Sequence, residues 1–357
     1  MECPHVPVIK YGDFGQRVAE SIGDKRFPYN GSIEVTSRCN LHCSHCYINP
    51  VSGAPKESEL NLAETTRILD EIADEGCLWL LLTGGEPFIR PDFLDIYTYA
   101  KKKGFIITLF SNGTLITPRI ADYLAEWPPF VVEISLYGCT QETYEKFTGV
   151  PGSFANCIRG IELLLERKIS LTLKTVVTTV NRHEISGIKE YAEKHQVDFR
   201  FDPILNLCLD GNPKPADYRI PATDVVAMDQ ADKERMQNWH RFSKNFKGAP
   251  QDPDYLYQCG AGARTFHIDS HGHLSVCMMA RVPYYDLRVA SFHQGWNDFM
   301  TKVRAQKWIR ETPCKTCDLI SICGQCPGMA YLETGDPEKK VEYLCEIAHL
   351  RKESLCL

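Results

Sequence analysis

The sequence predicts an α/β fold in which six consecutive βα units form a parallel sheet, followed by a small cysteine-rich domain. From about residue 31 to residue 205, short apolar runs rich in β-branched and aromatic residues alternate with helical patterns. From Cys259 to Cys345, seven cysteines recur, several at short spacings, and no long alternating pattern continues. The alternation is typical of either an open doubly wound sheet or a partial barrel.

Each predicted strand is an apolar run bounded by turn residues or by a helical pattern. The helix over Leu62–Glu75 ends before Gly76, a residue suited to the position after a helix. Thr117 and Pro118 read as an N-cap followed by proline in the first turn of the next helix. The six strand-like runs are Ser32–Thr36, Leu78–Thr83, Phe105–Phe110, Val131–Ser135, Leu171–Thr178 and Phe199–Pro203.

A change of composition marks the predicted domain boundary. Residues 210–221 are rich in proline, glycine and aspartate, as in a loop or linker, and residues 222–247 read as helical and polar. The predicted organisation is an N-terminal extension (1–30), the βα region (31–215), a helical linker (216–258) and the cysteine-rich domain (259–357).

Composition excludes several classes of function. The net charge of −6 gives no electrostatic reason to expect a nucleic-acid partner. No membrane span is expected, because the strongest apolar run, Cys77–Leu82, is far too short, and Met1–Arg17 lacks the apolar segment of a signal peptide. We therefore expect a cytoplasmic protein, in which its 16 cysteines serve metal or cluster binding rather than disulfides.

Three cysteines lie on one loop after the first strand: Cys39, Cys43 and Cys46. Three thiolates can hold three corners of a [4Fe–4S] cluster, which leaves the fourth iron open to another ligand. The alternative is a zinc site of three cysteines completed by His42 or His45.

The second strand ends in Thr83-Gly84-Gly85-Glu86-Pro87. Glycines at this point let the backbone approach a ligand closely, at the same end of the sheet as the cysteine loop. A Gly-Gly turn alone is weak evidence of a cofactor site. Together with the cysteine loop one βα unit earlier, it favours such a site.

These two motifs resemble the signatures of the radical S-adenosylmethionine (SAM) superfamily, and the resemblance extends over essentially the whole chain. It implies a partial (β/α)6 barrel of TIM type, in which Cys39, Cys43 and Cys46 hold a [4Fe–4S] cluster whose open iron binds SAM. Cleavage of SAM by the reduced cluster would give a 5′-deoxyadenosyl radical that abstracts hydrogen from a substrate.

The resemblance also implies which residues contact SAM. The amino group would meet the Gly84-Gly85-Glu86-Pro87 turn, and the carboxylate would pair with Lys174. His45 stands where the family usually has an aromatic residue beside adenine. The ribose would be reached by polar residues at the ends of the third and fourth strands, namely Ser111, Asn112, Glu133 and Ser135.

The later cysteines form a second metal-binding pattern. Its centre reads Cys314-x2-Cys317-x5-Cys323-x2-Cys326, a paired motif whose commonest alternative is zinc. With Cys259, Cys277 and Cys345 there are seven candidate ligands, which exceeds one zinc ion and approaches the eight that two [4Fe–4S] clusters need.

This arrangement resembles the SPASM extension of radical SAM enzymes, which carries two auxiliary clusters, so the second domain would be an iron–sulfur domain. The family's ligation implies an outer cluster on Cys314, Cys317, Cys323 and Cys345, and an inner one on Cys259, Cys277 and Cys326. The inner cluster is then one cysteine short. Its fourth position would be open to substrate or water, or filled by Cys208, Cys356 or a ligand without sulfur.

Three further residues follow barrel strands on the expected active-site side. Cys139 and Cys208 are candidates for donating a hydrogen atom to a substrate radical, and Tyr137 is a candidate substrate contact. The remaining cysteines are expected to pack as small apolar residues.

The resemblance predicts a peptide-modifying enzyme that crosslinks, oxidises, epimerises or excises residues of a ribosomally made peptide, supported by a reductant such as flavodoxin or ferredoxin. Only about thirty residues precede the first strand, so recognition of a leader peptide is expected to need a separate protein or a different surface. The alternatives are a radical SAM enzyme acting on a small molecule, such as a porphyrin, a sugar or a cofactor precursor, and a non-catalytic iron–sulfur electron carrier.

Overall fold

The computed structural model describes residues 11–23, 25–48, 59–245 and 254–355. One mixed sheet organises them, with the strand order β6-β5-β4-β3-β2-β1-β7-β8-β9. The six predicted strands are all present and parallel to one another, and β6 and β9 form the two edges, so the barrel is partial, as predicted. The strands are β1 (Asn30–Glu34), β2 (Trp79–Thr83), β3 (Ile106–Ser111), β4 (Val131–Ser135), β5 (Leu171–Val176), β6 (Asp198–Asp202), β7 (Thr265–Ile268), β8 (His273–Ser275) and β9 (Tyr285–Asp286).

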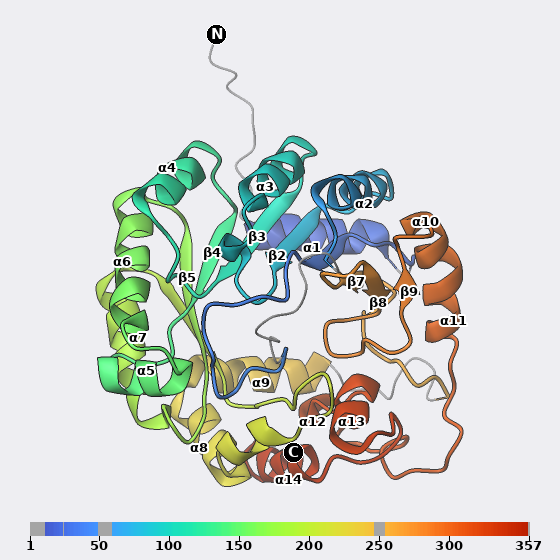
Figure 1. Ribbon diagram of the computed structural model, residues 1–357. Helices are drawn as coiled ribbons and strands as arrows, with labels where there is room; N and C mark the ends of the chain where they lie inside the picture. Colours follow the sequence, from blue (N-terminus) through green and yellow to red (C-terminus); the bar gives the residue numbers. More distant parts are fainter. Residues whose placement is uncertain (1–10, 24, 49–58, 246–253, 356–357) are drawn as a thin grey trace.

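Helices cover the outer face of the parallel strands (Figure 1). The first begins where the sequence predicts, because Asn61 and Glu64 form a reciprocal capping box at its start. Thr117 likewise caps the helix that opens with Pro118. These helices are α2 (Leu62–Asp74), α3 (Phe93–Lys102), α4 (Pro118–Glu126), α5 (Gln141–Thr148), α6 (Ser153–Glu166) and α7 (Ile185–Lys194), with short 3₁₀ turns η2 (Pro87–Ile89) and η3 (Arg182–Glu184).

The period of two along each strand separates the core from the barrel interior. In β4, Val132 and Ile134 are fully buried in the apolar core, whereas Glu133 and Ser135 alternate with them on the other face. Polar side chains are therefore presented to the interior of the barrel.

An N-terminal helix, α1 (Tyr11–Ile22), was not predicted from the sequence. The ring of Phe14 lies 5.9 Å from that of Trp79, the first residue of β2, so α1 packs near the amino-terminal end of this strand. In Figure 1 it lies behind the sheet, away from the loops at the carboxyl ends of the strands.

The cysteine spacing indicated a separate C-terminal domain. In the structure, part of this region joins the barrel sheet. Strand β7 pairs in parallel with β1, and β8 and β9 continue the sheet in antiparallel order. These strands have only two to four residues, which explains why no alternating pattern was visible.

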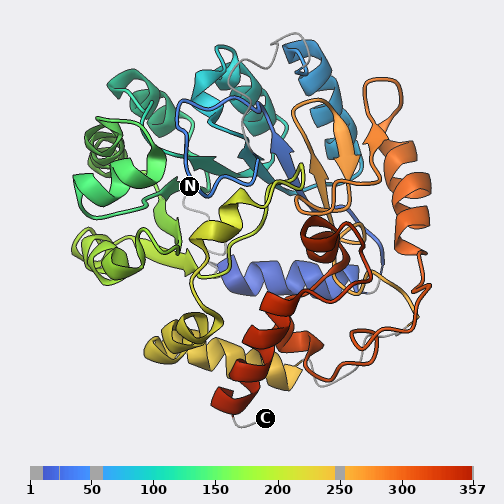
Figure 2. The same cartoon turned by 60° about the horizontal axis from the view of Figure 1, so that its bottom comes forward.

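The last helices form a small second core with the linker helices, and Figure 2 shows α14 beside α8 and α9. Arg351 of α14 pairs with Asp229 of α8 at 2.9 Å, and both side chains are buried. No helix in the described ranges is long and apolar enough to cross a membrane. The remaining helices are η4 (Lys214–Tyr218), α8 (Ala222–Ala231), α9 (Lys233–Asn245), α10 (Phe292–Gln294), η5 (Gly295–Phe299), α11 (Met300–Arg304), α12 (Ile320–Cys323), α13 (Pro327–Thr334) and α14 (Glu342–Leu355).

Candidate radical SAM site

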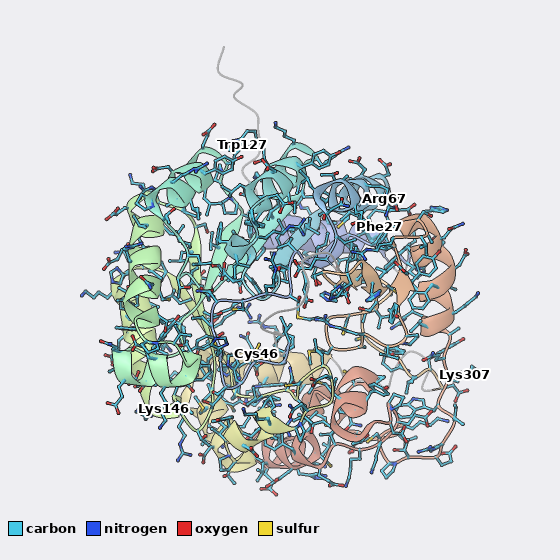
Figure 3. The ribbon with its side chains drawn as sticks, viewed as in Figure 1. Phe27, Cys46, Arg67, Trp127, Lys146 and Lys307 are labelled. Atoms are coloured by element: carbon cyan, nitrogen blue, oxygen red, sulfur yellow. The ribbon has the colours of Figure 1, made fainter. Side chains whose placement is uncertain are left out.

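The loop after β1 carries the three predicted cysteines to a cavity of about 300 Å³ at the carboxyl ends of the parallel strands. Cys39, Cys43 and Cys46 all line it, and Figure 3 shows Cys46 toward the middle of the molecule. Backbone contacts with α5 hold the loop, since His42 N–H donates to the carbonyl of Thr148 at 2.9 Å.

The three thiols lie close enough to influence one another. Burial first, and then Glu86 and Cys46, raise the pKa of Cys39 to about 11. Burial, then Cys46 and Cys39, raise the pKa of Cys43 well above its usual value. A positively charged metal group is therefore needed to hold these thiols as thiolates.

The histidines of the loop are not placed to complete a zinc site with the three cysteines. A cubane cluster instead takes each thiolate on a different iron. His42 is exposed and His45 packs between aromatic rings, so the geometry does not support the zinc alternative.

The glycine turn after β2 lies against the backbone of the cysteine loop. A Cβ on Gly84 would stand 2.3 Å from the carbonyl oxygen of Thr36, and one on Gly85 would stand 2.2 Å from that of Arg38. Gly85 N–H also donates to the Thr36 carbonyl at 2.9 Å. Both glycines line the cavity, so the close approach that they permit shapes the site.

Glu86 does not line this cavity. Its fully buried carboxylate accepts hydrogen bonds from the Ser111 hydroxyl at 2.9 Å and from the Asn112 backbone N–H at 2.7 Å. It thus joins the ends of β2 and β3 and positions Ser111 and Asn112, which do line the cavity. Pro87 is buried and opens η2 behind the site.

Lys174 of β5 reaches the cavity over an aromatic ring. Its ammonium nitrogen lies 2.7 Å from the centre of the Phe110 ring and 3.6 Å from a carboxylate oxygen of Glu133. Glu133 also contacts the guanidinium of Arg200 and does not itself line the cavity. Burial lowers the pKa of Lys174 well below its usual value, although Glu133 opposes the shift.

His45 and Tyr137 form an aromatic wall with Phe147. The Tyr137 ring stacks on Phe147 at 4.3 Å, and the His45 ring lies 4.6 Å from Phe147. The Nδ1 atom of His45 is buried with no hydrogen-bond partner in the part of the chain that the structure describes, and burial lowers the pKa of His45 to about 3. A neutral imidazole with a free polar atom at the cavity is suited to a polar ligand there.

The two candidate hydrogen-donor cysteines do not line the cavity. Cys139 is exposed, and its backbone N–H donates to Glu184 at 2.6 Å. Cys208 is buried behind the cysteine loop, where its thiol donates to the carbonyl of Cys46 at 3.4 Å.

Several cavity residues were missed at the sequence level. Arg200, Asp202 and Asn206 lie at and after the end of β6, and Tyr47 follows the last cysteine of the loop. Their only signal was position, because residues at strand ends gather at one edge of a parallel sheet.

The later cysteines gather in two groups. Burial, then the thiols of Cys345, Cys314 and Cys317, raise the pKa of Cys323 to about 11. We call these four the outer cysteine group.

The other three cysteines surround Tyr257. Burial, then Cys277, Cys326 and Cys259, raise the pKa of its hydroxyl to about 12. We call Cys259, Cys277 and Cys326 the inner cysteine group. Cys208 is not among the thiols that act on it, and Cys356 lies outside the described residues.

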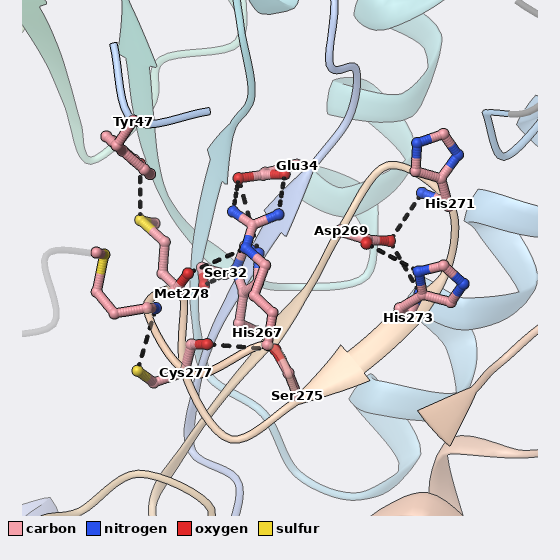
Figure 4. A network of polar contacts seen from close by, with 12 residues as sticks. Ser32, Glu34, Tyr47, His267, Asp269, His271, His273, Ser275, Cys277 and Met278 are labelled. Atoms are coloured by element: carbon pink, nitrogen blue, oxygen red, sulfur yellow. Dashed lines mark hydrogen bonds and ion pairs between the residues drawn. The ribbon is translucent and has the colours of Figure 1, made fainter. Parts of the chain in front are cut away.

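The turn 277–281 connects the inner group to the barrel (Figure 4). The Tyr47 hydroxyl donates to the sulfur of Met278 at 2.9 Å. Arg281 holds the carboxylate of Glu34 on β1 through both terminal nitrogens, one of them at 2.9 Å. The cavity loop and the inner cysteine group are therefore fastened to each other.

Comparison with known proteins agrees with this geometry. The family described as the Radical SAM superfamily matches residues 33–192. The chain is 28% identical to the AdoMet-dependent heme synthase of Methanosarcina barkeri, over 85% of this chain and 92% of that protein. It is 25% identical to the subtilosin biosynthesis protein AlbA of Bacillus subtilis, over 89% of this chain and 72% of AlbA.

Among solved structures, the fold is similar to that of Streptococcus suis SuiB bound to the precursor peptide SuiA. The TM-score is 0.70 at 16% identity, over 97% of this chain and 83% of SuiB. At that identity the likeness concerns the fold.

Proposed function

This chain belongs to the radical SAM superfamily through residues 33–192, and from that premise we propose that it abstracts hydrogen from a ribosomally made peptide. The observation that carries the chemistry is the convergence of three cysteine thiols and the glycine turn on one cavity at the strand ends. The product would be a crosslinked, oxidised, epimerised or excised residue.

Cys39, Cys43 and Cys46 would hold the cluster, and SAM would bind beside it along the Gly84-Gly85 turn, which lines the same cavity. The chemistry that these cofactors supply when bound is reductive cleavage of SAM to a 5′-deoxyadenosyl radical. Lys174, desolvated against Phe110, would pair with the SAM carboxylate. His45, neutral because it is buried, would offer an unprotonated ring nitrogen or an N–H to the adenine.

Cavity size favours a substrate that inserts one side chain. About 300 Å³ is at the low end for ligand sites, and SAM would occupy much of it. A peptide satisfies this limit by extending one residue toward the cavity while the rest of its chain stays outside. The AlbA relative, a bacteriocin biosynthesis protein, supports the same choice.

A porphyrin is the second candidate substrate. The heme synthase relative is covered over 92% of its length, by 85% of this chain. A porphyrin also carries side chains that extend from a larger body, so the same geometrical limit admits it.

SAM cleavage by the reduced, anaerobically reconstituted protein tests the enzyme itself. We expect formation of 5′-deoxyadenosine, its loss in Cys46→Ala, and its retention in His42→Ala, which alters an exposed side chain of the same loop. Absence of 5′-deoxyadenosine from the wild type would leave the electron-carrier alternative. Flavodoxin or ferredoxin would replace the chemical reductant in the cell.

Mass spectrometry then separates the substrates. Candidate precursor peptides encoded beside this protein are co-expressed with it, with and without any separate leader-binding protein. A loss of two mass units indicates oxidation or crosslinking, and deuterium uptake without a mass change in ordinary water indicates epimerisation. Consumption of an iron porphyrin with unchanged peptides would overturn the peptide proposal in favour of the second candidate.

A further inference from the structure

Two arginines lie beside the inner cysteine group, and they differ in their partners. Arg281 acts electrostatically on Cys277, and its guanidinium is engaged by Glu34, a residue only 2% exposed. The charge of Arg281 is therefore compensated by a buried carboxylate.

Arg304, by contrast, has no carboxylate partner among the described residues. Its Nη1 atom donates to the carbonyl oxygens of Cys259 at 2.7 Å and of Ala261 at 3.2 Å. Among the described residues no carboxylate lies within ion-pair distance of it, and the groups that favour its charged form are Cys259 and Tyr257.

The position of Arg304 is fixed by packing. The methylene groups of its side chain lie 3.3 Å from the point where a Cβ on Gly262 would stand. Gly262 has a φ of +70°, so glycine meets both the backbone conformation and the space requirement at this point. The chain thus directs a cation to the inner cysteine group and holds it there.

We propose that Arg304 is the counter-charge of an iron–sulfur cluster on Cys259, Cys277 and Cys326, and that it raises the reduction potential of that cluster. This inference rests on the auxiliary clusters that the SPASM resemblance implies. An oxidised [4Fe–4S] core carries two positive charges, so three thiolates leave one net negative charge. One arginine without an acidic partner would neutralise this charge, which accounts for the placement of Arg304 but not for the fourth ligand of the cluster.

The mechanism of tuning is electrostatic. Reduction adds a negative charge to the cluster, and a fixed nearby cation stabilises the reduced state more than the oxidised state. Loss of the cation should therefore lower the potential of the inner cluster. The outer cysteine group is not among the groups that interact electrostatically with Arg304. The reduction potential of the outer cluster should therefore stay unchanged when Arg304 is replaced.

The test is a redox titration of the reconstituted holoprotein followed by electron paramagnetic resonance. Arg304→Gln removes the charge, Arg304→Lys keeps it, and Arg264→Gln is the matched control. Arg264 is half-buried, as Arg304 is, and it also donates to a backbone carbonyl, that of Gly23 at 2.8 Å rather than that of a cysteine of the inner group.

We expect Arg304→Gln to lower the potential of one auxiliary cluster, with wild-type values in Arg304→Lys and Arg264→Gln. Unchanged potentials in a fully loaded Arg304→Gln protein, or an equal shift of every cluster, would overturn the inference. If the wild type binds only one cluster yet cleaves SAM, the inference fails while the radical SAM function stands. If SAM cleavage is absent although auxiliary clusters are present, the proposed function fails alone.

Thermal unfolding supplies a second readout that does not need a redox signal. In the cluster-free protein, Arg304→Gln should leave the Tm unchanged or raise it, because an uncompensated cation is removed. In the loaded protein the same substitution should lower the Tm. A decrease of equal size in both forms would indicate a purely structural role and would contradict the proposal.

Discussion

At the scale of single residues, the site contains a carboxyl group whose burial opposes its ionisation. Glu86 is a carboxylate with no exposed surface, and its partners are hydrogen-bond donors rather than a cation. Burial raises its pKa to about 7, against the lowering effect of these hydrogen bonds. The folded protein therefore binds a proton at Glu86 in a range of pH where the unfolded chain has lost it.

This shift predicts a pH dependence of stability. The contribution of the Glu86 proton to the free energy of unfolding is fully present below about pH 4.5. It is lost as the pH rises through 7, and the total loss is about 3 kcal/mol. Glu86→Gln should lack this decline, because the amide does not ionise. Urea unfolding of the cluster-free protein from pH 4.5 to 8 measures it, with the exposed Glu142→Gln as control. Parallel curves for wild type and Glu86→Gln would contradict the assignment.

Gly85 is a second residue at which neighbouring atoms determine the effect of a substitution. In Gly85→Ala the new methyl group would overlap the carbonyl oxygen of Arg38, a backbone atom that moves only with the cysteine loop. We expect a loss of about 1–3 kcal/mol in the free energy of unfolding, together with reduced iron binding at the loop.

Chemical denaturation and iron analysis check this prediction. Gly15→Ala in α1 is the control, because a Cβ there meets nothing within 4 Å. Full iron content and unchanged stability in Gly85→Ala would show that the loop adjusts freely.

At the scale of elements, the contact that matters most joins β1 to the turn 277–281. These segments are far apart in the chain, and they meet because β7 pairs with β1 and β8 leads into the turn. The ion pair between Glu34 and Arg281 then fixes the turn on the barrel.

Breaking this pair should be costly. Arg281→Met leaves Glu34 buried without its partner, for which we expect a loss of about 3–5 kcal/mol in the free energy of unfolding. The double variant Glu34→Leu/Arg281→Met should recover most of that loss. A double-mutant cycle in urea measures both, and additive single effects would show that the pair is not coupled.

At the scale of the whole molecule, the chain presents three cysteine groups in one continuous structure. The loop after β1 holds the first. The inner group runs from Cys259, before β7, to Cys326 at the start of α13, and the outer group runs from Cys314, before α12, to Cys345 in α14. The continuous sheet connects the segments that carry the first two groups.

Iron analysis tests this arrangement. Three [4Fe–4S] clusters predict about twelve irons per chain, and Cys345→Ala should reduce this to about eight by removing one ligand of the outer group. Cys139→Ser, at an exposed cysteine in none of the groups, serves as the control. About four irons accompanied by zinc would contradict the three-cluster organisation.

The sequence by itself determined the six parallel βα units, because strand and helix patterns are local and repeat six times, whereas the choice of a partial barrel over an open sheet came from the family resemblance. It also determined which residues to expect at the cavity wherever a motif carried them, such as Cys39 and Gly84. Residues marked only by a polar side chain at a strand end, such as Arg200, could not be recognised, since their role depends on which strands become neighbours.

Only the tertiary structure decided the rest. Glu86 and Glu133 lie behind the cavity rather than at its surface, because their carboxylates are taken up by neighbouring strands. Strands β7 to β9 join the cysteine-rich region to the barrel sheet. They are too short to show an alternating pattern in the sequence. The uncompensated charge of Arg304 was likewise invisible in the sequence, because the absence of a partner is a property of space and not of the chain.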